Sequence, residues 1–286
     1  MDRTYCSLLV VDDDEFSRDL LSRRLAKEGY TVATAEDGKE ALALLEHETF
    51  DLILLDIMMP EIDGIETLQR IRSSPVLREI PVMMVTALNS RDDVRQCIEL
   101  GANDYISKPF DMLLVKSRVW RCLEGGSYCE IRPGKIAEEP QSNVLIVDDN
   151  AVNLDILSRR IAKSRHHCFS ARDGKQAIDL LREHNIDLVL LDINMPEMDG
   201  ISVLKAMKSD PDLQDIAVIM VSANTDNETV HTCLKLGADD YISKPFNATI
   251  LKSRMTPLLK IKKKADMERL TREKLVALST LGAKFR

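Results

Sequence analysis

Aromatic residues are scarce in this sequence: they make up 4% of its 286 residues and include a single tryptophan. The buried cores must therefore be built mainly from aliphatic side chains and methionine. Six cysteines are present, but no CxxC pair and no Cys/His cluster has the spacing of a zinc site. We expect reduced, mostly packed thiols, as in a cytoplasmic protein.

Long apolar stretches are also missing. No run of about 18 apolar residues occurs, and the N-terminus lacks the apolar segment of a signal peptide, so we expect no membrane association. Acidic residues (47) outnumber lysine and arginine (39), and the net charge of -8 argues against direct nucleic-acid binding. With 44% hydrophobic and 30% charged residues, the composition is that of a globular protein.

What the sequence does contain is an internal repeat. Three segments recur at a constant offset of 136 positions: 8–13 at 144–149, 51–57 at 187–193, and 104–110 at 240–246. No insertion or deletion separates these landmarks, which excludes chance and predicts two copies of one domain. Each copy has about 120 residues, an ordinary domain size.

The repeat predicts domains at residues 1–124 and 143–262, joined by a linker at 125–142. The linker contains three glycines and two prolines and shows no apolar periodicity. Residues 263–286 form a basic, helix-compatible tail. We expect this tail to extend the last helix of the second domain, or to act as a signalling helix that pairs in a dimer.

The hydrophobic pattern of each copy indicates an α/β fold. Wholly apolar runs at 8–11, 52–55 and 82–85 are typical of strands that are buried on both faces. Amphipathic stretches between these runs predict helices. Five repeats of strand and helix predict a doubly wound domain with a parallel sheet.

Polar residues stand where these strands end. Asp12 and Asp13 end the first predicted strand, Asp56 the third and Thr86 the fourth, and Lys108 follows the fifth. Because ligands of open α/β sheets bind at the carboxyl ends of the strands, we expect these side chains to meet at one edge. The second copy repeats the set as Asp148, Asp149, Asp192, Ser222 and Lys244.

Three converging carboxylates repel one another unless a cation lies between them. Oxygen ligands with open positions suit Mg²⁺, or Mn²⁺, and we expect one ion per copy. Aspartate is a nucleophile for phosphoryl groups, and the candidates are Asp56 and Asp192. The pairs Asp63-Gly64 and Asp199-Gly200 that follow are interpreted as turn residues.

Phosphoryl transfer also needs charge neutralisation around the transferred group. Lys108 and Lys244 offer a point charge, and the hydroxyls of Thr86 and Ser222 can donate a hydrogen bond. Each of these residues alone is more often a cap, a surface residue or a packed side chain. The complete set, present twice at fixed spacing, favours the functional interpretation.

Together these motifs resemble the receiver domain of two-component response regulators. The matching segments are Val-Asp-Asp, Leu-Leu-Asp-Ile-x-Met-Pro-Glu-x-Asp-Gly, Thr/Ser-Ala and Gly-Ala-x-Asp-Tyr-Ile-Ser-Lys-Pro-Phe, each found in both copies. The resemblance covers residues 5–124 and 141–262. It implies a flavodoxin-like fold with strand order 2-1-3-4-5 in each domain, and phosphorylation by a histidine kinase or histidine phosphotransfer protein.

The resemblance also implies roles for single residues. The backbone carbonyls of Met58 and Asn194 would complete the two metal sites. On phosphorylation, the hydroxyl of Thr86 or Ser222 would move toward the phosphate while an aromatic side chain turns inward behind it. These aromatic residues are Tyr105 and Tyr241. The change would alter the partner-binding face formed by the fourth helix, fifth strand and fifth helix.

The two copies differ beside the acceptor. In the family the residues two positions after the acceptor and two after the hydroxyl influence hydrolysis; here they are Met58 and Leu88 in the first copy, Asn194 and Asn224 in the second. Apolar neighbours should hinder an attacking water, and amides can hold one. We therefore expect phospho-Asp56 to outlive phospho-Asp192.

The leading hypothesis is a signalling switch in which phosphorylation controls homodimerisation and an output domain beyond residue 286, with a diguanylate cyclase as one candidate by analogy of architecture. The abrupt end of the sequence suggests a truncated chain. The alternative is a stand-alone phosphorelay or interaction module without output. A phosphatase of the haloacid dehalogenase type would need an aspartate two positions after the nucleophile, where this chain has Met58 and Asn194.

Overall fold

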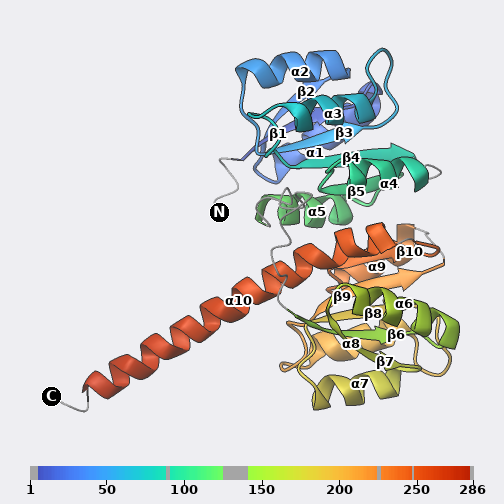
Figure 1. Ribbon diagram of the computed structural model, residues 1–286, viewed down its shortest axis with the longest axis vertical. Helices are drawn as coiled ribbons and strands as arrows, with labels where there is room; N and C mark the ends of the chain where they lie inside the picture. Colours follow the sequence, from blue (N-terminus) through green and yellow to red (C-terminus); the bar gives the residue numbers. More distant parts are fainter. Residues whose placement is uncertain (1–5, 88–90, 125–140, 224–226, 247, 284–286) are drawn as a thin grey trace. The chain divides into compact units, whose positions relative to one another are not determined.

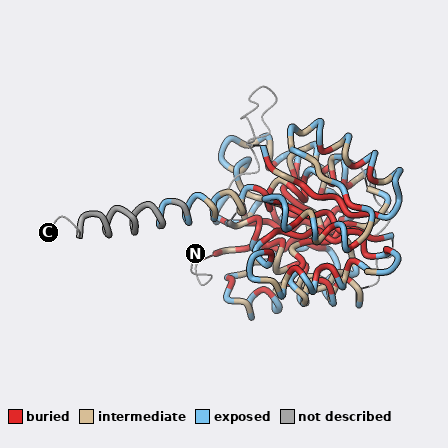
Figure 2. The backbone as a smooth tube through the Cα atoms, turned by 90° about the horizontal axis from the view of Figure 1, so that it is seen from below, coloured by how far each residue is buried: buried red, intermediate tan, exposed pale blue. Residues whose placement is uncertain are grey.

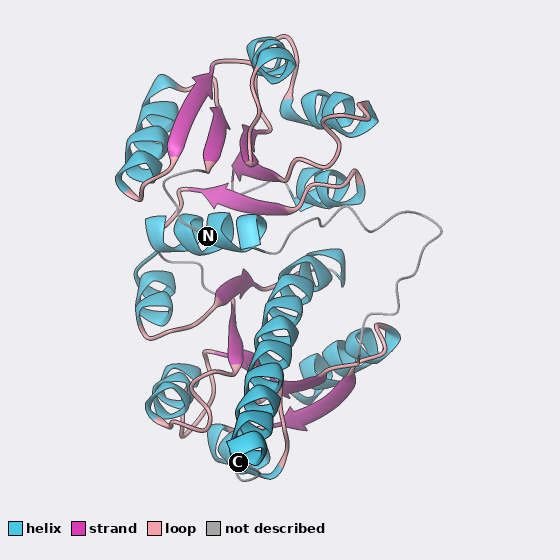
Figure 3. Ribbon diagram, turned by 90° about the vertical axis from the view of Figure 1, so that its left-hand side faces the viewer, coloured by secondary structure: helices cyan, strands magenta, loops and turns pink. Residues whose placement is uncertain are grey.

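The structure is a computed structural model, and it describes residues 6–87, 91–124, 141–223, 227–246 and 248–283. It contains two five-stranded parallel sheets with helices on both sides, one in each copy of the repeat (Figures 1 and 3). Buried residues, red in Figure 2, make up most of the central strands, for example residues 8–11 and 52–56. The predicted α/β class is thereby confirmed.

The first copy has the strand order β2-β1-β3-β4-β5, as the resemblance implied. Neighbouring strands are parallel; for example, Leu9 of β1 stands opposite Ala33 of β2 and Ile53 of β3. The order changes direction between β1 and β3, so a crevice for ligands is expected at their carboxyl ends. The elements are β1 (Ser7–Val11), α1 (Glu15–Lys27), β2 (Thr31–Ala35), α2 (Gly38–His47), β3 (Leu52–Asp56), α3 (Gly64–Ser73), β4 (Val82–Ala87), α4 (Arg91–Glu99), β5 (Asp104–Lys108) and α5 (Met112–Glu124).

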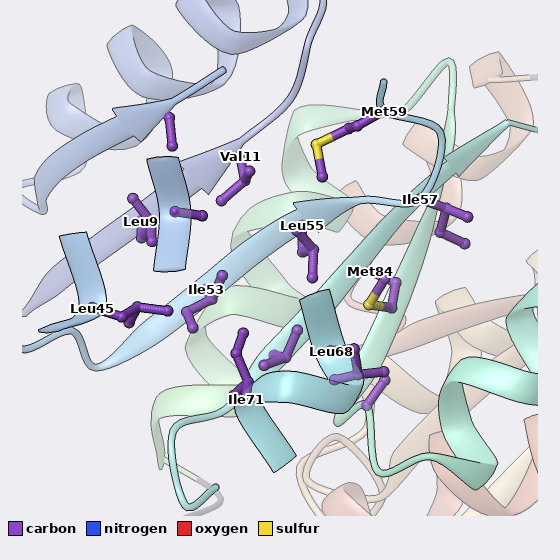
Figure 4. Packing of buried hydrophobic residues seen from close by; sticks show 14 of the residues in the cluster. Leu9, Val11, Leu45, Ile53, Leu55, Ile57, Met59, Leu68, Ile71 and Met84 are labelled. Atoms are coloured by element: carbon purple, nitrogen blue, oxygen red, sulfur yellow. The ribbon is translucent and has the colours of Figure 1, made fainter. Parts of the chain in front are cut away.

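Aliphatic side chains hold this sheet against its helices. Alternate residues of a strand point to opposite faces, and on one face they pack against α2, α3 and α4. Figure 4 shows part of this cluster around the central strands. Its members include Leu9, Val11, Leu45, Ile53, Leu55, Leu68, Ile71 and Met84, each with at most 8% of its surface exposed. A buried β3 therefore carries Asp56 at its end with little freedom to move.

The second copy repeats the architecture with the order β7-β6-β8-β9-β10. Its sheet has the same parallel register, with Val144 of β6 opposite Cys168 of β7 and Leu188 of β8. The elements are β6 (Asn143–Val147), α6 (Ala151–Lys163), β7 (His167–Ala171), α7 (Gly174–Glu183), β8 (Leu188–Asp192), α8 (Gly200–Ser209), β9 (Ala217–Ser222), α9 (Asn227–Lys235), β10 (Asp240–Ser243) and α10 (Ala248–Ala283).

The last helix is longer than the others. α10 runs for 36 residues and includes Pro257, so the last helix of the second copy continues without a break into the predicted tail. An ion pair between Lys262 and Asp266, at 3.6 Å, joins positions four residues apart on this helix. The helical extension of the tail is as predicted.

Packing groups the chain into two compact units, residues 1–140 with 222–254 and residues 141–221 with 255–286. This grouping differs from the repeat, so the domain boundaries drawn from the sequence stay a prediction. Residues 125–140 of the predicted linker at 125–142 lie outside the described residues. None of the helices that the structure describes combines the length and apolar character needed to span a bilayer.

Candidate metal centres at the strand ends

The first acidic cluster forms where β1 and β3 end. One carboxylate oxygen each from Asp12, Asp13 and Asp56 lies within 4.8 Å of the others. Asp12 and Asp56 are buried, with 1% and 4% of their surface exposed, whereas Asp13 is exposed. The predicted convergence of these three residues is therefore present, with one side of the cluster open to solvent.

Lys108, the last residue of β5, bridges the two buried carboxylates. Its Nζ lies 2.7 Å from Asp12 Oδ2 and 2.8 Å from Asp56 Oδ2. Burial alone would lower the pKa of Lys108, but the close contacts with the two carboxylates and their negative charges together outweigh burial and raise it. The ammonium group thus stays charged and partly neutralises the cluster.

Asp56 is held through both of its carboxylate oxygens. Oδ1 accepts a hydrogen bond of 2.8 Å from the backbone N–H of Ile57, and Oδ2 accepts a hydrogen bond from Nζ of Lys108. Burial raises the pKa of Asp56, and Lys108 only partly opposes this effect. The negative charge on this side chain is therefore costly, and any group that delivers positive charge to it is favoured.

The loop after β1 fixes Asp12. Its Oδ1 accepts the backbone N–H of Asp14 at 3.0 Å, and its carbonyl oxygen accepts a hydrogen bond of 2.6 Å from Arg18. Asp14 caps α1 by accepting the N–H and hydroxyl of Ser17, and these hydrogen bonds lower the pKa of Asp14. The start of α1 therefore orients the acidic cluster at this edge of the sheet.

The predicted switch residues of the first copy stand on the strands β4 and β5. Thr86 is 2% exposed near the end of β4 and stands opposite Ser107 of β5. Tyr105 on β5 is half-buried, its carbonyl oxygen accepts a hydrogen bond from Arg118 of α5, and the Arg118 guanidinium lies 5.7 Å from the centre of its ring. The hydroxyl and the aromatic ring thus belong to the neighbouring strands β4 and β5.

The Asp63-Gly64 pair does more than make a turn. Asp63 is the N-cap of α3 and accepts the N–H of Glu66 at 2.7 Å. A Cβ on Gly64 would lie 2.0 Å from the carbonyl oxygen of Asp56. Because this oxygen belongs to the backbone, it can move away only if the strand itself shifts. Gly200 stands in the same relation to Asp192, at 2.1 Å. The missing side chain lets helix and acceptor strand approach closely.

The second cluster repeats the first with different supports. Carboxylate oxygens of Asp148, Asp149 and Asp192 again lie within 4.8 Å of one another. Asp148 Oδ1 accepts the backbone N–H of Asn150 at 2.9 Å, and the side-chain amide of Asn153 donates to both oxygens of Asp148 at 3.1 Å. The first copy has Ser17 at the position of Asn153, and there the hydroxyl bonds Asp14 instead.

The remaining predicted residues of the second copy occupy matching places. Ser222 ends β9 with 1% of its surface exposed, and its carbonyl oxygen accepts the backbone N–H of Lys244 at 2.6 Å. Tyr241 on β10 is buried, and Asn194 is exposed. In the first copy Met58 is likewise exposed, by 67%, while Leu88 and Asn224 lie outside the described residues.

Sequence reasoning missed Arg18 and Asn153, because each stands one turn into a helix and looks like an ordinary helical residue. A comparison of the two copies could have found Asn153, since the second copy carries an amide where the first carries serine.

The donor set suits a hard divalent cation. Each cluster offers three carboxylates, one of them exposed, which leaves room for water ligands as Mg²⁺ prefers. The buried, raised-pKa Asp56 gains from any added positive charge. The residues present therefore fit Mg²⁺, and the ligands would be those predicted from the sequence.

Known proteins are similar to this chain over most of its length. The family model described as "Response regulator receiver domain" matches residues 8–119 and 144–256. The response regulator PleD of Caulobacter vibrioides is 30% identical over 274 residues, which cover 91% of this chain and 60% of PleD. The alkaline phosphatase synthesis transcriptional regulatory protein PhoP of Bacillus subtilis is 45% identical over 112 residues, which cover 39% of this chain and 46% of PhoP. A solved structure of a putative two-component system response regulator/GGDEF domain protein is 23% identical, with a TM-score of 0.41, and is aligned over 90% of this chain and 99% of its own.

Proposed function

The chain belongs to the response regulator receiver family and carries two receiver domains, and on this premise we propose that Asp56 and Asp192 each accept a phosphoryl group. The observation that carries the proposal is the pair of acidic clusters, which stand at equivalent strand ends in both copies. Receiver domains are phosphorylated by histidine kinases or phosphotransfer proteins. Such a protein is the donor we propose for this chain.

The metal ligands we propose are Asp12, Asp13 and Asp56 in the first receiver, with the backbone carbonyl of Met58. Their counterparts in the second receiver are Asp148, Asp149, Asp192 and the backbone carbonyl of Asn194. Bound Mg²⁺ supplies positive charge to the phosphoryl oxygens and to the carboxylates.

The chain's own residues then divide the work of transfer. A carboxylate oxygen of Asp56 forms the bond to phosphorus as the phosphorus–nitrogen bond of the donor phosphohistidine breaks, and the imidazole leaves. Lys108, already on Asp56 Oδ2, stays beside the new group and balances its charge. In the second receiver Asp192 and Lys244 take these roles.

The same site carries the proposed switch. The Thr86 hydroxyl, buried at the end of β4, donates a hydrogen bond to the new phosphoryl oxygen, and Tyr105 follows it inward. In the second receiver Ser222 takes the role of Thr86, and Tyr241, which is already buried, is the counterpart of Tyr105. Tyr105 lies on β5 beside α5, so its movement changes the surface formed by α4, β5 and α5.

We propose that this surface change controls dimerisation and an output domain. The chain spans 60% of the length of PleD, so part of PleD lies outside the matched region. A diguanylate cyclase remains the candidate output, and a stand-alone phosphorelay or interaction module remains the alternative. A gene product with a cyclase motif after residue 286 would support the first; a natural stop codon there would support the second.

Intact-mass spectrometry after incubation with Mg²⁺ and acetyl phosphate tests the core of the proposal. We expect two phosphoryl additions on the wild-type chain and one on each of Asp56→Asn and Asp192→Asn. Omission of Mg²⁺ should abolish both additions. Additions that survive in the double variant, or that map to other residues, would refute the assignment of the acceptors.

A further inference from the structure

The two receivers hold their first metal-binding aspartate in different ways. In the second receiver, Nδ2 of Asn153 lies 3.1 Å from both carboxylate oxygens of Asp148. Asn153 belongs to the first turn of α6, whose N-cap Asn150 accepts its backbone N–H at 3.4 Å. The amide thus reaches the acidic cluster from a rigid helix start.

This contact orients Asp148 with a neutral donor. The amide nitrogen must face the carboxylate, because the amide oxygen would repel it. Asp148 also accepts the N–H of Asn150 at 2.9 Å, so its plane is fixed from two directions. In the first receiver the equivalent residue is Ser17, and its hydroxyl bonds Asp14 instead.

The charge of the donor decides its effect on a metal. Because the amide is neutral, it can stabilise the orientation of a ligand carboxylate without adding a positive charge that would repel an incoming divalent ion. The two hydrogen bonds of 3.1 Å are at the long end of the range for N–H···O bonds. One carboxylate oxygen of Asp148 can therefore turn to the metal while the other keeps its hydrogen bond to the amide of Asn153. Hydrogen-bond partners behind metal ligands typically change affinity by about 10–100-fold.

We propose that Asn153 is a positioning residue that strengthens divalent-cation binding at the second receiver by holding Asp148 in its ligating orientation. The inference rests on the proposed function, because it takes Asp148 as a metal ligand. It predicts that the second site fills at lower Mg²⁺ concentration when Asn153 is present than when it is serine, the residue of the first copy.

Mn²⁺ binding, measured on the full chain from the electron paramagnetic resonance signal of free Mn²⁺, tests this inference without phosphorylation. An Asp13→Ala background removes a ligand of the first site, so that the second site is measured. In that background Asn153→Ser should raise the dissociation constant about 10-fold. The matched control is Val152→Ala, its neighbour on α6, which is 64% exposed and should leave the constant unchanged.

Thermal unfolding without metal separates positioning from folding. A lower unfolding midpoint with an unchanged dissociation constant would assign Asn153 a structural role and overturn the inference. A constant within twofold of the parent, or tighter binding, would overturn it as well while leaving the proposed function intact. If Asp149→Ala removes no Mn²⁺ binding from the Asp13→Ala parent, the second metal site itself fails, and the inference fails with it.

Discussion

Replacement of Gly64 by alanine should disable one receiver and leave the other working. A Cβ at this position would lie 2.0 Å from the carbonyl oxygen of Asp56, and real Cβ contacts essentially never fall below 3.0 Å. The start of α3 or the end of β3 must therefore shift by about 1 Å. A displacement of about 1 Å at a reacting group can cost roughly 100-fold in rate, and we expect that loss at Asp56.

The tandem arrangement supplies the control within one molecule. With Mg²⁺ and acetyl phosphate, peptide mass spectrometry can follow Asp56 and Asp192 in the same sample. Gly64→Ala should slow only the phosphorylation of Asp56. Gly200→Ala should slow only the phosphorylation of Asp192, because a Cβ on Gly200 would lie 2.1 Å from the Asp192 carbonyl oxygen. Gly174→Ala is a milder comparison, since its Cβ would meet only side-chain atoms, which can move.

Two outcomes would refute this reasoning. Asp56 phosphorylated at the wild-type rate in Gly64→Ala would mean that the backbone absorbs the added methyl group without moving the acceptor. Equal slowing of Asp56 and Asp192 would mean that the substitution acts through the whole chain. Circular dichroism at the assay temperature distinguishes a displaced acceptor from an unfolded receiver.

Three further predictions follow from the first site. Without metal, Lys108→Met should lower the free energy of unfolding by about 2 kcal/mol in urea. This is less than the roughly 3–5 kcal/mol expected for a fully buried ion pair, because 25% of the Lys108 side chain is exposed. Mg²⁺ should reduce the stability difference between variant and wild type, and an unchanged difference would contradict the idea that Lys108 and Mg²⁺ both neutralise the carboxylates. Because the pKa of Asp56 is raised above its usual 3.8, the folded protein binds a proton at this side chain more tightly than the unfolded chain does. Protonated Asp56 therefore adds to the stability of the fold at low pH, and this stability is lost as pH rises through the raised value. Metal-free Asp56→Asn should therefore gain stability over wild type as pH rises from 3.8 through the raised value, and a stability difference that stays constant with pH would refute the cause. Phospho-Asp56, beside Met58, should outlive phospho-Asp192 in a decay assay on single-acceptor variants, and equal lifetimes or the reverse order would end that idea.

Repeat and motif spacing predicted much of the architecture. Buried parallel strands need continuous apolar runs, and the polar residue that ends each run is then placed at the sheet edge by topology alone. That is why Asp12, Asp13 and Asp56 could be expected from the sequence to converge, and they do. The strand order within each sheet was available only through the family resemblance, because strand lengths and periodicity do not rank neighbouring strands.

Hydrophobic pattern and spacing were enough to predict two α/β domains and the carboxylates that gather in each. They could not predict how each carboxylate is held, which is a matter of packing: Lys108 lies between Asp12 and Asp56, the amide of Asn153 contacts Asp148, and Gly64 lets α3 approach Asp56 closely. Such contacts join residues from separate elements at distances of a few ångströms. Pattern fixes which elements form, but packing fixes their separations, and the charge balance of a site depends on those separations.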